Sequence, residues 1–168
     1  MNPIHLLYRF AQTGRALYWR VFRPKVFGAK LVVRNAAGEV LLIRHSYGRS
    51  DLYMLPGGGI RRGEAAVDAA QRELMEEVGC RAEGLALLGE YFDDSKGARN
   101  HVSVFTATTS DQPKIDGREI IEARFFPVTA LPASASSASR QRILEMLGEA
   151  QPDGRWHPVA AQNPGAPQ

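Results

Sequence analysis

Three glutamates lie close together between residues 64 and 78, where the spacing of apolar residues predicts a helix. Glu73, Glu76 and Glu77 are spaced i, i+3 and i+4, so a helix places them on one face. Carboxylates at this spacing repel one another, and a hard divalent cation with oxygen ligands removes the repulsion. Acidic triplets are also common on solvated helix faces, so a second feature must decide between a metal site and a solvated face.

A glycine-rich turn stands directly before this helix and supplies the second feature. Pro56 is followed by Gly57, Gly58 and Gly59, and a backbone without side chains can approach a ligand closely. Its carbonyl oxygens could complete a metal site, and its amides could contact phosphate. The turn and the acidic helix together predict a site for a divalent metal and a diphosphate.

The spacing of these residues resembles the signature box of the Nudix hydrolases, which cleave a nucleoside diphosphate linked to another moiety. The box runs from Gly58 to Cys80, and the matching positions are Gly58, Glu64, Arg72-Glu73-Leu74, Glu76-Glu77 and Gly79. Cys80 is the one departure, because the family has an aliphatic residue there, and a buried free cysteine behaves as a small apolar residue. The resemblance extends over residues 29–132.

The resemblance implies a fold of the α/β class, an α/β/α sandwich around a mixed β-sheet. It also implies Mg²⁺ or Mn²⁺ as the cofactor, with Glu73, Glu76 and Glu77 as ligands and the Gly57 carbonyl assisting. Arg72 would orient a ligand glutamate. The implied reaction is Mg²⁺-dependent hydrolysis of a diphosphate bond, in which a carboxylate accepts the proton of the attacking water.

The residue that acts as general base stays open at this stage. It differs among family members, and the candidates here are Glu73, Glu77, Glu119 and Glu122. Substrate contacts are expected from the backbone of Gly58 and Gly59 and from two side chains that precede the turn, Arg44 and Tyr53. Tyr53 could equally belong to the core, and Arg44 could be solvated. His45 and His101 have no companions at metal-ligand spacing, which favours ordinary imidazoles over metal ligands.

The substrate class also stays open. None of the additional marks of the ADP-ribose, dinucleoside-polyphosphate or coenzyme A subclasses is present, so a nucleoside diphosphate derivative is the general expectation. A nucleoside triphosphate pyrophosphatase is the enzymatic alternative. A Nudix-fold module that senses a nucleotide without hydrolysing it is the alternative of another class. The absence of a Gly-x-Ser-x-Gly turn and of a P-loop argues against a serine hydrolase or a kinase.

Short strands and two helices surround these motifs. Apolar runs predict strands at residues 30–34, 39–44, 85–92, 102–107 and 123–128, with a hairpin turn at residues 35–38. The first helix ends at Gly79, and Val67, Ala70, Leu74 and Val78 form its buried stripe. A serine at the end of residues 133–139 is expected to cap a second helix at residues 140–147.

The 168 residues suit one domain with extensions at both ends. We expect a basic amphipathic N-terminal extension with a helix at residues 1–28, a Nudix domain at 29–150 and a flexible tail at 151–168. Residues 1–38 hold seven Arg or Lys residues and no acid, whereas the remainder holds 14 basic and 18 acidic residues. The acidic body makes nucleic acid an unlikely main partner, and a small nucleotide is expected instead.

The basic extension allows three roles: packing on its own domain, packing in a homodimer, or weak contact with an anionic membrane surface. The single cysteine excludes a disulfide framework and a multi-cysteine zinc site, and no apolar run is long enough to span a membrane. These features predict a cytoplasmic protein.

Overall fold

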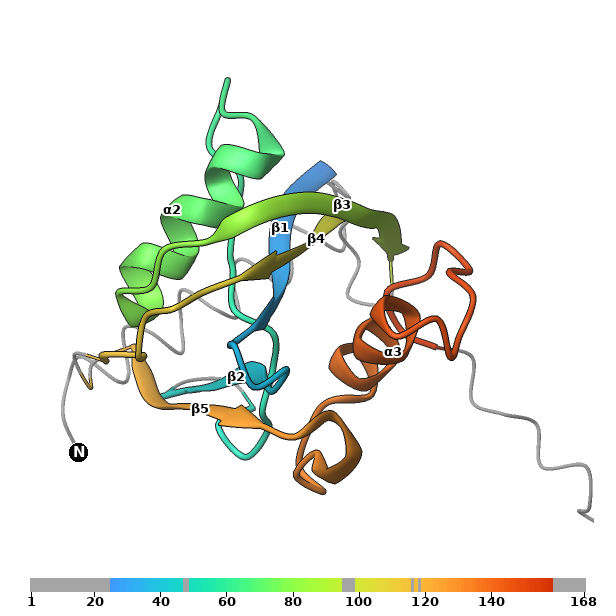
Figure 1. Ribbon diagram of the computed structural model, residues 1–168. Coiled ribbons are helices and arrows are strands. Elements are labelled where there is room, and N and C mark those ends of the chain that lie inside the picture. The colour runs from blue at the N-terminus through green and yellow to red at the C-terminus, as the bar shows by residue number, and fades with distance from the viewer. Residues whose placement is uncertain (1–24, 47–48, 95–98, 116, 118, 159–168) are drawn as a thin grey trace, which may run out of the picture.

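The computed structural model describes residues 25–46, 49–94, 99–115, 117 and 119–158. Five strands form one mixed sheet in the order β3-β4-β1-β2-β5 (Figure 1). The strands are β1 (Lys25–Arg34), β2 (Val40–His45), β3 (Glu83–Asp93), β4 (Arg99–Thr108) and β5 (Ile120–Phe126). Only β1 and β4 pair in parallel, and the other neighbours are antiparallel.

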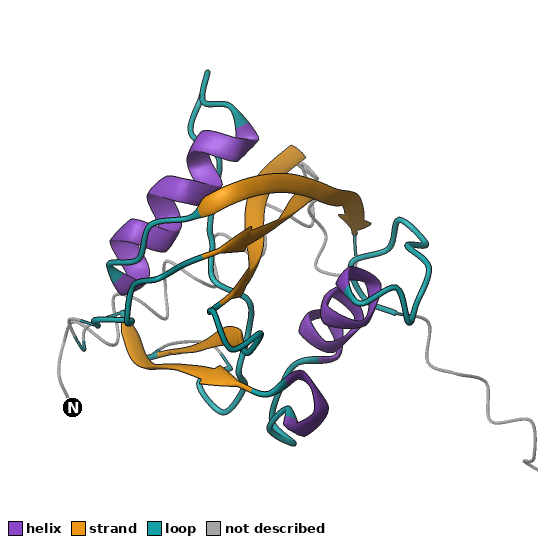
Figure 2. Cartoon of the chain, in the orientation of Figure 1, coloured by secondary structure: helices purple, strands orange, loops and turns teal. Residues whose placement is uncertain are grey.

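Two helices cover opposite faces of this sheet (Figure 2). Ala29, Leu31 and Val33 point to one face and pack with the buried residues of α2 (Ala66–Val78). Val32 faces the other way and packs with Ile143 of α3 (Ser137–Met146). Because successive strand residues point to opposite faces, the apolar run at 31–33 supplies both cores. This arrangement confirms the α/β/α sandwich around a mixed sheet.

The sheet is split between β1 and β2, and the glycine-rich turn fills the split. The two strands pair only where Arg34 faces Val40. Beyond that point the Ala29 amide donates to the Gly58 carbonyl at 2.9 Å, and the Leu31 amide donates to the Pro56 carbonyl at 3.0 Å. On the other side, residue 43 of β2 exchanges backbone hydrogen bonds with residue 54. The turn is therefore held as an element of the sheet.

Several boundaries differ from the sequence-based expectations. Strand β1 begins at Lys25, because its parallel pairing with β4 continues to Lys25 opposite Arg99. Helix α2 begins at Ala66, and Val67 is 38% exposed, while Ala69 is buried beside the rest of the expected stripe. The cap of α3 is Ser136, which accepts a hydrogen bond from the Ser139 amide. A short 3-10 helix, η1 (Val128–Ala130), follows β5.

Two turns agree with the expectations. Gly79 ends α2 in the left-handed conformation, with φ 64° and its amide donating to the Met75 carbonyl. Gly38, with φ 78°, closes the turn between β1 and β2. A glycine is favoured at each of these positions because other residues rarely adopt a positive φ.

The structure describes parts of both expected extensions of the chain. Within the expected tail, two backbone hydrogen bonds join the chain to β3: the Phe92 amide donates to the Gly154 carbonyl at 2.8 Å, and the Trp156 amide donates to the Phe92 carbonyl at 3.0 Å. Residues 159–168 lie outside the described residues, and the flexible tail stays a prediction. Residues 1–24, which hold most of the expected N-terminal helix, lie outside the described residues. No helix among the described residues is long and apolar enough to cross a membrane.

Candidate active site

The glycine turn requires glycine at residue 57 for steric reasons, and a side chain at residue 58 would displace a glutamate. Gly57 has φ 122°, and a Cβ atom there would lie 2.2 Å from the Ala29 carbonyl oxygen. A Cβ atom on Gly58 would lie 2.6 Å from the Glu73 carboxylate carbon. Gly57 therefore lets the turn lie against β1, and Gly58 gives the Glu73 carboxylate its space.

Glu77 is the most buried of the three glutamates. Its side chain is 8% exposed, and one carboxylate oxygen accepts a hydrogen bond of 2.7 Å from the Gly57 amide. Burial raises the pKa of Glu77 to about 7, against the opposing effects of Lys30 and of that hydrogen bond. A buried carboxylate in this state is favourably placed to receive a cation.

Lys30 of β1 brings a cation to this position. Its amine contacts the carbonyl oxygen of Gly57 and lies 3.3 Å from that of Leu55. Burial lowers the pKa of Lys30, while the charges of Glu77 and Glu73 raise it. Sequence reasoning counted Lys30 only among the basic N-terminal residues. The signal that could have found it is a lysine between Ala29 and Leu31, within the otherwise apolar stretch 26–33 of the strand.

Arg72 connects the other two glutamates to the start of the helix. Its guanidinium group makes two hydrogen bonds to Glu64, at 2.7 and 2.9 Å, and one to Glu73 at 2.7 Å. It also reaches Glu76 at 3.1 Å and the Gly59 carbonyl at 3.0 Å. These contacts put the Arg72 guanidinium group beside two of the expected metal ligands, and its orienting role stays a prediction. Hydrogen bonds from Arg72 and the Arg61 amide lower the pKa of Glu64 to about 2.

The three glutamates do not converge on a single point. Glu76 is half-exposed and forms ion pairs with Arg61 at 3.2 Å and with Arg72 at 3.1 Å. Glu73 faces Arg72, whereas Glu77 faces the Gly57 amide. Among the described residues, no three His, Cys, Asp or Glu side chains are arranged to hold a metal ion.

The donor set around the turn nevertheless fits a hard divalent cation chemically. Glu73 lies against Gly58, in the space that a Cβ atom would fill. Glu77 is buried beside Gly57, and burial raises its pKa in spite of the opposing charge of Lys30. These donors are oxygen atoms, the ligand type that Mg²⁺ and Mn²⁺ prefer.

The two candidate bases outside the helix lie in different surroundings. Glu122 of β5 pairs with Arg44 at 2.9 Å, and hydrogen bonding from Tyr53 lowers the pKa of Glu122. Glu119 precedes β5, and its charge acts on both His45 and Glu77. Glu119 therefore lies within electrostatic reach of the buried Glu77, and Glu122 forms an ion pair with Arg44.

The positions of Tyr53 and His45 refine their expected roles. Tyr53 is 8% exposed and packs edge-on against Phe126, with ring centroids 5.0 Å apart, which favours its alternative role in the core. Arg44 lies over the Tyr53 ring at 5.5 Å. His45 is buried, and its Nε2 atom lies 3.9 Å from a Glu77 carboxylate oxygen. Spacing alone missed His45 because its neighbour is more than 30 residues away in the chain.

Comparison with known proteins places the chain among relatives of one type. A family model described as the NUDIX domain matches residues 24–147. An uncharacterized Nudix hydrolase of Pseudomonas aeruginosa is 34% identical over 115 residues, which is 65% of this chain and 68% of the relative. An NAD-capped RNA hydrolase of Pseudomonas syringae pv. tomato is 31% identical over 139 residues, 81% of this chain and 49% of the relative.

A shorter sequence match and a solved structure of similar fold add to these relatives. An RNA pyrophosphohydrolase of Teredinibacter turnerae is 40% identical over 67 residues, 40% of this chain and 37% of the relative. The crystal structure of a MutT NUDIX hydrolase from Burkholderia pseudomallei superimposes with a TM-score of 0.64 at 24% identity. That match covers 72% of this chain and 97% of the other, and it supports the fold alone.

Proposed function

The chain belongs to the NUDIX family, and on this basis we propose that it hydrolyses a diphosphate bond in a nucleoside diphosphate linked to another moiety. The observation that carries the proposal is the packing of Glu77 and Lys30 against the Gly57 backbone. A buried carboxylate, an ammonium group and a glycine turn at one place suit a site that handles charged groups.

Glu73, Glu77 and the Gly57 carbonyl would hold a divalent cation, with Glu76 at the exposed side. When bound, Mg²⁺ or Mn²⁺ neutralises diphosphate charge and acts as a Lewis acid toward water. Arg72 holds Glu73 and Glu76 in position through hydrogen bonds of 2.7 and 3.1 Å. The amide hydrogen bond from Gly57 fixes the Glu77 carboxylate in the same way.

The attacking water must give its proton to a carboxylate, and we propose Glu119 ahead of Glu122. The charge of Glu119 raises the pKa of the buried Glu77, so Glu119 lies within electrostatic reach of the candidate metal site, whereas the Glu122 carboxylate lies 2.9 Å from the Arg44 guanidinium group. We expect Glu119→Gln to lower kcat by at least about 100-fold, within the range for a lost general base. Glu122→Gln should lower kcat by less than about tenfold, and the reverse order would assign the base to Glu122.

The experiment that tests the function is a substrate screen with Mg²⁺ and with Mn²⁺, read by phosphorus NMR. The panel contains nucleotide sugars, ADP-ribose, dinucleotides and nucleoside triphosphates. We expect Glu76→Gln to lower turnover at least about 100-fold without unfolding the protein, because Glu76 is 51% exposed and lies outside the core. Cleavage of no substrate by the wild type would refute the proposal.

A second candidate substrate is a diphosphate at the 5′ end of RNA. The names of two relatives, an NAD-capped RNA hydrolase and an RNA pyrophosphohydrolase, favour it. Adding a short 5′-triphosphorylated and a 5′-NAD-capped RNA to the panel tests this candidate. The cytoplasmic location, the homodimer and the membrane contact of residues 1–28 stay predictions.

A further inference from the structure

Three aromatic rings stand side by side at one end of the sheet. Phe27 of β1 faces His101 of β4 in the strand register, and His101 faces Phe92 of β3. The ring centroids of Phe27 and His101 are 5.7 Å apart, and those of His101 and Phe92 are 4.6 Å apart and nearly parallel. We call Phe27, His101 and Phe92 the aromatic row.

The aromatic row is much more exposed than rings of this size usually are. Phe27 is 47% exposed and Phe92 is 60% exposed. By strand alternation, Phe27 lies on the same sheet face as Ala29 and Leu31, which are completely buried and pack in the cluster beneath α2. The row therefore extends the apolar face of the sheet beyond the part that this helix covers.

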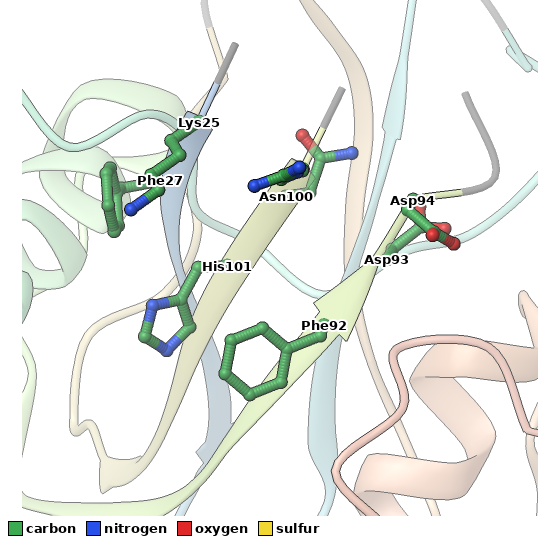
Figure 3. Close-up of a pocket in the computed structure, with 8 residues that line it drawn as sticks. Lys25, Phe27, Phe92, Asp93, Asp94, Asn100 and His101 are labelled. Atoms are coloured by element: carbon green, nitrogen blue, oxygen red, sulfur yellow. The ribbon is translucent and has the colours of Figure 1, made fainter. Parts of the chain in front are cut away.

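The aromatic row lines a pocket of about 470 Å³ (Figure 3). Figure 3 shows the His101 ring between those of Phe27 and Phe92. The polar groups around the pocket include Lys25, Arg99 and Asn100, and two aspartates follow Phe92. Aromatic faces with a few polar groups at the rim are suited to a flat heterocycle, because any base can stack on a ring while its edge forms hydrogen bonds.

The pocket adjoins the glycine turn of the candidate active site. The Ile60 amide donates to the Phe27 carbonyl at 3.0 Å, and Gly28 forms a β-bridge with Gly59. Two residues along β1, the Ala29 amide bonds to the Gly58 carbonyl. At about 3.4 Å per strand residue, Phe27 lies about 7 Å along the strand from that contact. Phe27 and Lys30 point to opposite faces of the sheet, so a nucleotide stacked at Phe27 could reach the turn from the face that α2 covers, where the Glu73 carboxylate lies beside Gly58.

We propose that the aromatic row is the nucleobase subsite, where the base of the substrate stacks while its diphosphate lies at the glycine turn. This inference rests on the proposed function for the position of the diphosphate. It adds that recognition of the substrate depends on a base, and that Phe27 and Phe92 determine its affinity.

The test compares Phe92→Ala with the wild type and with Leu87→Ala. Leu87 is a matched control, because it is 57% exposed on the same strand and does not line the pocket. For the best nucleotide substrate, we expect Phe92→Ala to raise KM by about tenfold and to change kcat by less than about twofold. Both variants should hydrolyse a base-free ribose diphosphate ester as the wild type does. An unchanged KM for the nucleotide would overturn the proposal.

A binding measurement separates this inference from the proposed function. Saturation-transfer NMR with the four nucleoside 5′-monophosphates, without metal, measures contact between the protein and the protons of the base. Base signals that disappear in Phe92→Ala and persist in Leu87→Ala would support the subsite even in a protein without hydrolase activity. Base signals that are equal in all three proteins would exclude the aromatic row as the subsite, whatever the activity.

Discussion

Replacing Lys30 by methionine tests how the buried charges of the active site are balanced. Methionine keeps an unbranched apolar side chain and removes the ammonium group that contacts the Gly57 carbonyl. That carbonyl and Glu77 would also serve a divalent cation, so the ammonium group and the metal compete for the same surroundings. We therefore expect Lys30→Met to bind Mn²⁺ more tightly than the wild type does.

The size of the effect follows from Coulomb's law. A monovalent and a divalent cation about 4 Å apart repel by about 2 kcal/mol even at the dielectric constant of water, and by more in a buried site. Removing the ammonium group should therefore lower the Kd for Mn²⁺ by roughly 30-fold. At saturating metal, about 2 kcal/mol of additional stabilisation raises Tm by about 4–8 °C for a chain of this size.

The assay is the rise in Tm on adding Mn²⁺, with the Kd measured by titration calorimetry. Loss of Lys30 also raises the pKa of Glu77 above its present value of about 7, so the Kd is compared at several pH values between about 7 and 8, where Mn²⁺ stays in solution and protonation of Glu77 appears as a pH dependence of the Kd. Lys25→Met is the control, because Lys25 is an exposed lysine on the same strand. A metal-induced rise in Lys30→Met no larger than in the wild type would refute the reasoning.

Four other variants test the turn and two ion pairs. Gly57→Ala should unfold or strongly destabilise the domain, because the new Cβ atom would meet a backbone carbonyl of β1. Gly59→Ala is the control and should keep the wild-type Tm, because the space around its Cβ atom is open. The pKa of Glu64 is lowered from 4.5 to about 2, so its ion pair with Arg72 stabilises the fold fully above about pH 4.5. This stabilisation is lost as the pH falls toward 2. The Tm difference between Glu64→Gln and the wild type should therefore disappear between pH 4.5 and pH 2. Arg142→Met leaves the buried Glu145 carboxylate without its 2.8 Å partner and should cost about 3–5 kcal/mol in urea unfolding.

The sequence was sufficient to predict the elements and the family, because both depend on local patterns. The apolar run at residues 31–33 and the turn at Gly38 were visible as short-range signals. The pairing of Arg72 with a glutamate of the box was implied by the family resemblance, which rests on a local motif. These predictions needed no knowledge of which strands pair.

Contacts between distant parts of the chain could not be read from the sequence. Lys30 meets the Gly57 carbonyl only because the sheet splits between β1 and β2. The start of β1 at Lys25 depends on pairing with a strand more than 70 residues later. The Trp156 segment looked like a tail because its partner, Phe92, lies far back in the chain.

The hydrogen bonds that hold residues 56–58 between the strands have a thermodynamic consequence for ligand binding. A free loop must be ordered when its ligand arrives, and part of the binding energy is spent on that ordering. Here the Ala29 and Leu31 amides already fix the loop, so its conformational entropy is lost once, when the chain folds. Interactions with a ligand can then act on the ligand's own geometry, which is the condition under which binding energy can lower a reaction barrier.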